Sequence, residues 1–157
     1  MTSKTTQIAA AGLLALAMPL AQAGPASATS IERHTTLSPV FSQTEAVGRD
    51  ILVAATRTTA LPDDLAAVVR DAVASADAAT TDARTALSQA NSPDVHTRWN
   101  AEGALQDART ALDAASAELR SVTALVDGID ASTTQALRVL QDDIDLLRGA
   151  GSALTSD

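Results

Sequence analysis

The feature that most constrains the fold is a run of small apolar residues spaced alternately three and four positions apart. Residues 101–126 keep this spacing with Ala101, Leu105, Ala108, Leu112, Ala115, Leu119, Val122 and Val126. Such spacing places apolar side chains in one stripe along a helix, as in helices that pack at shallow angles in bundles and coiled coils. No segment shows comparable strand alternation. The chain is therefore predicted to be all-α.

Three further segments carry the same kind of stripe. The segment 62–90 has Leu65, Val69, Ala72, Ala76, Ala79, Ala83, Ala86 and Ala90, with Leu87 beside the last pair. The segment 132–148 has Thr133, Leu137, Leu140, Ile144 and Leu147. A weaker stripe begins in the segment 42–59, with Val47, Ile51, Ala54, Thr58 and Leu61. Four helices are thus predicted.

Helix boundaries are marked by capping residues. Two segments, 42–45 (SQTE) and 132–135 (STTQ), have the form of a capping box, in which the first side chain accepts from the amide three residues later. Pro62 and Pro93 suit helix starts. Asn91 is predicted as a left-handed stop, and Gly128 as the C-terminal cap of the third helix.

The predicted chain order is a leader, a bundle and a tail. Residues 1–28 resemble a secretory signal peptide, with Lys4 before an apolar stretch, 8–18, and small residues at two candidate cleavage sites. Residues 29–41, rich in Ser and Thr, are predicted to be an extended leader or linker. Residues 42–148 form the helical bundle domain, and residues 149–157 a flexible C-terminal tail. We therefore expect an exported protein, secreted or in the periplasm or cell envelope.

Helix lengths suggest an architecture. The two middle segments span about 29 and 35 residues, roughly 45 and 50 Å of helix, and the outer two about half of that. Short connections make neighbouring helices antiparallel. The prediction is an antiparallel bundle of four helices, in which the long 62–127 hairpin projects from a four-helix stub and has its tip at 91–93. Pairs at i,i+4 are expected to stabilise the helices at Glu45/Arg49, Asp94/Arg98, Arg109/Asp113 and Arg138/Asp142.

Composition argues against several functions. The chain has 35 Ala, one Trp, one Phe and no Tyr, so a wide pocket lined by aromatic residues is not expected. A net charge of −8 disfavours nucleic acid as a partner, because that affinity depends on clustered cations. There is no Cys, which excludes thiol catalysis and disulfides. After signal cleavage no segment could span a membrane.

Residues for catalysis or metal binding are sparse. The two histidines, His34 and His96, have no second ligand at metal-binding spacing, so no metal, haem or other cofactor is expected. Asp142, Asp143 and Asp145 lack a glycine-bearing calcium loop and are interpreted as a solvated helix face. No glycine-rich phosphate motif is present. We expect no enzyme activity.

The hexapeptide Asp-Ala-Arg-Thr-Ala-Leu occurs twice, at 82–87 and at 107–112. Either a helix was duplicated or the repeat arose by chance, and the small set of residue types in these segments favours chance. No array of repeats of solenoid length is present.

The candidate binding residues lie at the start of the third helix: Val95, His96, Arg98 and Trp99. Trp and Arg are enriched among binding hot spots. Trp99 is open to two interpretations: a contact for a partner, or a packing residue that covers the end of the alanine stripe over Leu87.

Two functions follow as hypotheses. The first is a non-enzymatic interaction or structural protein whose hairpin tip contacts an envelope or extracellular protein; a homodimer through the hairpin is a related hypothesis. The second is a carrier or coat for a small apolar or lipid ligand held between amphipathic helices. It ranks second because the chain lacks the basic faces and bulky anchors of membrane-binding helices.

Overall fold

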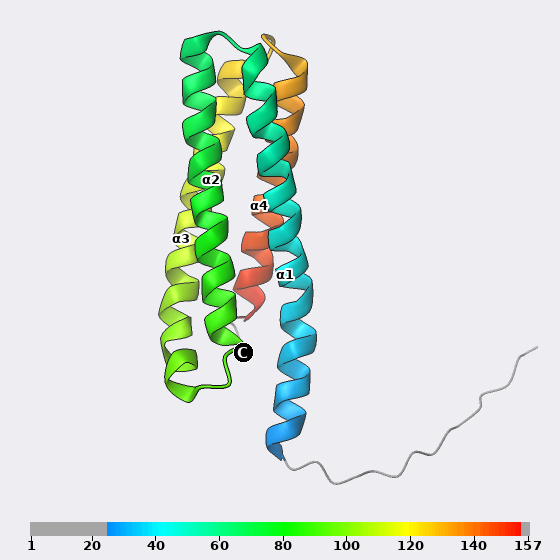
Figure 1. Ribbon diagram of the computed structural model, residues 1–157, viewed down its shortest axis with the longest axis vertical. Coiled ribbons are helices and arrows are strands. Elements are labelled where there is room, and N and C mark those ends of the chain that lie inside the picture. The colour runs from blue at the N-terminus through cyan, green and yellow to red at the C-terminus, as the bar shows by residue number, and fades with distance from the viewer. Residues whose placement is uncertain (1–24, 155–157) are drawn as a thin grey trace, which may run out of the picture.

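The computed structural model describes the backbone of residues 25–154 and the side chains of residues 37–150. It contains four long helices, α1 (Pro25–Arg57), α2 (Asp63–Ala90), α3 (Val95–Val126) and α4 (Ala131–Leu154), with one 3-10 turn, η1 (Thr58–Ala60). The helices lie side by side along the long axis (Figure 1). No strand occurs within 25–154, and the predicted all-α class is confirmed.

The predicted apolar stripes form the core. The α4 stripe is buried throughout, with Leu137, Leu140 and Ile144 completely inaccessible. All members of the stripe that begins in α1 are also buried, as are most members of the stripes of α2 and α3. Only Leu65, Ala90 and Leu105 are half-buried. Burial of these apolar surfaces is the main driving force for the packing of the four helices.

The prediction that residues 29–41 form an extended leader is wrong, because this range lies within α1. The same stripe continues upstream of Val47, and Leu37, Val40 and Thr44 are buried at the same spacing. Pro39 is on the exposed side of the helix. The Ser42 hydroxyl donates to the Ser38 carbonyl at 3.2 Å, a contact made in the middle of a helix, and does not cap one.

The predicted start and end of the fourth helix also need correction. The expected cap was the 132–135 box, but Asp130 is the cap, and its Oδ2 accepts from the Thr133 amide at 2.7 Å. The predicted flexible tail from residue 149 is helical as far as Leu154. Gly149 does not interrupt α4, since Gly128 is the only described residue with a positive φ, +83°. Asn91, expected in the left-handed region, has a φ of −86°.

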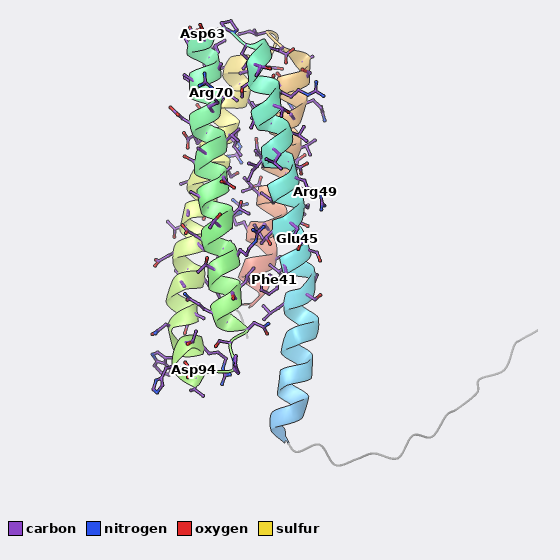
Figure 2. All side chains as sticks on the ribbon, in the orientation of Figure 1. Phe41, Glu45, Arg49, Asp63, Arg70 and Asp94 are labelled. Atoms are coloured by element: carbon purple, nitrogen blue, oxygen red, sulfur yellow. The ribbon has the colours of Figure 1, made fainter. Side chains whose placement is uncertain are left out.

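The prediction that the two outer helices are about half as long as the middle two is wrong for both α1 and α4. The α1 helix has 33 residues, against 28 for α2 and 32 for α3, while α4 has 24. In Figure 1, α1 runs beside the hairpin of α2 and α3 and continues past its turn, whereas α4 ends before that turn. The connections 58–62 and 127–130 lie at the opposite end, and Figure 2 shows Asp63 and Asp94 at these two ends.

Polar side chains join the helices at several levels. The Arg84 Nη2 atom on α2 donates to the Thr44 carbonyl of α1 at 3.3 Å, and the Ser116 hydroxyl on α3 donates to Asp145 of α4 at 2.8 Å. Within residues 37–150, every buried side-chain nitrogen and oxygen has a hydrogen-bond partner. None of the helices in the described range is long and apolar enough to cross a membrane.

Candidate functional site

The candidate site is the turn between α2 and α3, together with the first two turns of α3. Asp94 is the N-cap of α3, and its Oδ2 accepts from the Thr97 hydroxyl at 2.6 Å and from the Thr97 amide at 2.7 Å. These two bonds, with the hydroxyl having the larger effect, lower the pKa of Asp94. The Asp94 carboxylate satisfies a free amide at the start of the helix and interacts favourably with the positive end of the helix dipole.

Arg98 holds the turn in place. Its Nη1 atom donates to the Ser92 carbonyl and to the Pro93 carbonyl, both at 2.9 Å. The side chain is half-buried across the turn that it braces. Arg98 is one of the predicted contact residues, and these bonds fix its guanidinium group against the turn. The expected ion pair between Arg98 and Asp94 does not form in the structure.

Val95 and Trp99 are the exposed apolar side chains of this region. Val95 is 65% exposed and Trp99 is 83% exposed. Their i,i+4 spacing places them next to each other on one face of α3. Such exposure contradicts the interpretation that Trp99 packs over Leu87, which is buried by other residues. Gly103, one turn further, has no atom within 4 Å of where a Cβ would be, so the surface beside Trp99 is open.

His96 completes the predicted set and is exposed on α3. The structure thus places all four predicted residues at one end of the molecule, in the turn region around Asp94 (Figure 2). Residues 37–150 hold no group of three His, Cys, Asp or Glu side chains able to bind a metal. What this region offers is an apolar contact surface, Val95 and Trp99, on a turn fixed by its own hydrogen bonds.

The acidic group on α4 differs from the solvated face that we predicted. Asp142 is exposed, but Asp145 accepts from Ser116 and lies 3.8 Å from the Nη2 atom of Arg120. The third acid, Asp143, is hydrogen-bonded to Asp50 of α1. Burial of Asp50, and then this hydrogen bond and the charge repulsion from Asp143, raise the pKa of Asp50. Two of the three acids therefore contact neighbouring helices, which the sequence pattern of α4 alone does not reveal.

A pocket inside the bundle was missed in the sequence. Its cavity volume is about 20 Å³, room for about one water molecule, and the hollow is partly open to solvent. Its lining is mostly apolar and comes from all four helices: Val40, Ala83, Leu87, Leu105, Gln106, Ala108, Arg109, Leu112, Leu147 and Arg148. The available signal was the repeated hexapeptide, because both copies contribute to this lining. A repeat in the sequence shows only that two segments are alike. That the two segments face each other can be seen only once the fold is known.

The chain matches no protein-family model, no curated protein and no solved structure. Its function must therefore be inferred from the residues themselves.

Proposed function

We propose that the protein is an exported, non-enzymatic helical protein that binds an envelope or extracellular protein through the tip surface, Val95 and Trp99. The observation that carries this proposal is the 83% exposure of Trp99 beside a 65% exposed Val95. Exposed apolar residues that stand alone are common on protein surfaces. Tryptophan is enriched among binding hot spots, and Val95 extends the exposed apolar surface beside Trp99.

The order of the turn supports the same proposal. Binding costs less when the contact residues are held in place before the partner arrives. The Asp94 cap and the two bonds from Arg98 order the start of α3 through hydrogen bonds that stay within the turn and α3. The finer architecture that we propose with it is an antiparallel bundle whose α2–α3 turn forms the contact end. Export rests on the signal-like segment 1–28, of which residues 1–24 lie outside the described range.

The test is capture of a partner from an envelope extract by the immobilised protein, with Trp99→Ala as the variant. We expect helix content to be unchanged, since Trp99 is 83% exposed, and recovery of the captured protein to fall by about tenfold or more. Leu146→Ala is the matched control, because Leu146 is 62% exposed on α4, away from the turn. Equal capture by wild type and Trp99→Ala would overturn the proposal.

A second copy of the chain is the competing partner for the tip surface. Sedimentation equilibrium of the wild type and of Trp99→Ala separates the two cases. A monomer in both, together with loss of the captured protein in the variant, supports a different protein as partner. A wild-type dimer that Trp99→Ala dissociates would replace the envelope partner with self-association.

A further inference from the structure

The tip surface, Val95 and Trp99, has an acidic neighbour in Glu102. Along α3, Glu102 follows Val95 by seven residues and Trp99 by three, so the three side chains lie on one face of the helix. Glu102 is exposed, and within residues 37–150 it has no hydrogen bond or ion pair. An unpaired carboxylate therefore lies beside an exposed indole.

The lack of a partner for Glu102 has a structural cause. Arg98 precedes Glu102 by four residues, a spacing at which an arginine and a glutamate pair along a helix. The Nη1 atom of Arg98 instead donates to the Ser92 and Pro93 carbonyls, both at 2.9 Å. The turn therefore uses the only arginine that lies three or four residues from Glu102 on α3.

The surface around the indole is open on the side of Gly103. Beyond the chain neighbours of Gly103 and the backbone of the helix, no atom lies within 4 Å of where a Cβ would be. A cation that lies over the face of a tryptophan ring is attracted to it, and a carboxylate next to the ring adds a charge-assisted hydrogen bond. Trp99 and Glu102 together thus have the chemistry to accept the side chain of a lysine or an arginine.

The charge of this region favours a cation over an anion. Residues 94–107 contain three acidic residues and one arginine, a net charge of −2 with histidine neutral, in a chain of net charge −8. The positive end of α3 is already opposed by the Asp94 carboxylate, which accepts from the Thr97 amide at 2.7 Å. Charge complementarity therefore selects a basic segment as the partner.

We propose that the partner of the tip surface presents a lysine or an arginine that lies on the Trp99 indole and pairs with the Glu102 carboxylate. An apolar side chain of the same partner segment covers Val95. This inference rests on the proposed function, because it names the chemistry of the partner that the tip surface binds.

The test compares two fluorescein-labelled helical peptides that differ in one side chain. Both are alanine-based and carry a leucine and, four residues later, either arginine or citrulline, which has nearly the shape of arginine but no charge. Fluorescence anisotropy measures their binding to the full mature protein. We expect the arginine peptide to bind at least about fivefold more tightly, because citrulline loses both the attraction to the indole and the ionic hydrogen bond.

Two variants divide the preference for arginine into its parts. Glu102→Gln removes the carboxylate and is expected to weaken binding of the arginine peptide by about threefold, with the citrulline peptide unchanged. Trp99→Leu keeps an apolar side chain but removes the aromatic face, so the preference for arginine should fall. Glu118→Gln is the matched control, because it removes the same charge about four turns further along α3. Circular dichroism checks that all three variants keep their helix content.

Three outcomes would overturn the inference: no binding of the arginine peptide, equal binding of the two peptides, or equal weakening by Glu102→Gln and Glu118→Gln. Each of them leaves the proposed function standing when capture of the envelope protein still depends on Trp99. Equal capture by wild type and Trp99→Ala would instead overturn the proposed function, whichever peptide is preferred. The two failures are therefore distinguishable.

Discussion

The two turns that precede α3 and α4 use the same local chemistry in different surroundings. Asp94 and Asp130 each accept from the amide of a threonine three residues later, both at 2.7 Å. At the 127–130 turn, the Thr133 hydroxyl also donates to the Arg57 carbonyl at 3.2 Å, and the Thr134 hydroxyl contacts the Val126 carbonyl at 3.3 Å. At the 91–94 turn, the corresponding bonds remain within the turn and the start of α3.

This comparison separates two ways of holding a helix start. The start of α4 is joined to other helices and buries Thr133 and Thr134 completely or nearly so. The start of α3 is held by its own residues and leaves its largest side chain in solvent. The side-chain hydrogen bonds at the start of α3 are therefore local, whereas those at the start of α4 also reach other helices. The start of α3 leaves Val95 and Trp99 exposed for contacts outside the molecule.

The largest expected difference between the two helix starts is in packing. Leu137→Ala, one turn after Thr133, creates a cavity in a fully buried position and is expected to lower the free energy of unfolding by about 2–5 kcal/mol. Val95→Ala at the start of α3 is the matched change and is expected to lower it by less than about 0.5 kcal/mol. Urea unfolding followed by circular dichroism measures both. Similar losses would contradict the comparison.

An intermediate effect is expected from the threonine hydroxyls. Thr133→Val keeps the shape of the side chain but removes the bond to Arg57, which is expected to lower the free energy of unfolding by about 1 kcal/mol. In Thr97→Val, the lost bond is to the neighbouring Asp94, so the free energy of global unfolding should fall by less than in Thr133→Val. Amide hydrogen exchange at the start of α3 would instead become faster. A larger global loss for Thr97→Val than for Thr133→Val would reverse the assignment.

The smallest expected effect is from the cap charges, and it depends on pH. Hydrogen bonding by Thr133, and then by Ser132, lowers the pKa of Asp130 to about 2. Since the folded-state pKa lies below the ordinary value of 3.8, this stabilisation is fully present above pH 3.8. It is lost as the pH falls through about 2.

Asp130→Asn tests this effect, with Asp94→Asn as its counterpart at the other turn. We expect the melting temperature of Asp130→Asn to lie slightly below that of the wild type at pH 7, with the gap closing as the pH falls toward 2. Asp94→Asn should instead mainly increase exchange at the start of α3. Melts from pH 2 to pH 7 provide the measurement, and a gap for Asp130→Asn that widens toward low pH would have the wrong sign.

The helices and their buried faces could largely be predicted from the sequence, because a stripe of constant spacing shows both the helix and its inward side. The start of α1 could not be predicted from the sequence, because Pro39 and the 42–45 box favoured a helix start near residue 42. The spacing of Leu37, Val40 and Thr44 was the better guide, as a buried stripe contributes more than one capping motif and an exposed proline on the outer face is tolerated. Local motifs gave the wrong answer where tertiary packing determined the structure.

The candidate site could also be predicted from the sequence only in part. Its residues could be chosen from the sequence, since Trp99 lies just off the stripe of α3. Whether the Trp99 side chain is covered could not be predicted from the sequence, because that depends on which helices surround the start of α3. The bracing role of Arg98 also required the path of the backbone at Ser92 and Pro93. The pocket needed all four helices in place before its lining became visible.

The exposure of Trp99 has a practical consequence for spectroscopy. It is the only tryptophan, the chain has no tyrosine, and its indole is already 83% exposed in the folded protein. Its fluorescence should therefore change little when the bundle unfolds, even while the helical circular dichroism signal is lost completely. In contrast, anything that covers the start of α3 should shift the emission to shorter wavelength. The intrinsic fluorescence of this protein thus reports occupancy of the tip surface and is nearly insensitive to folding.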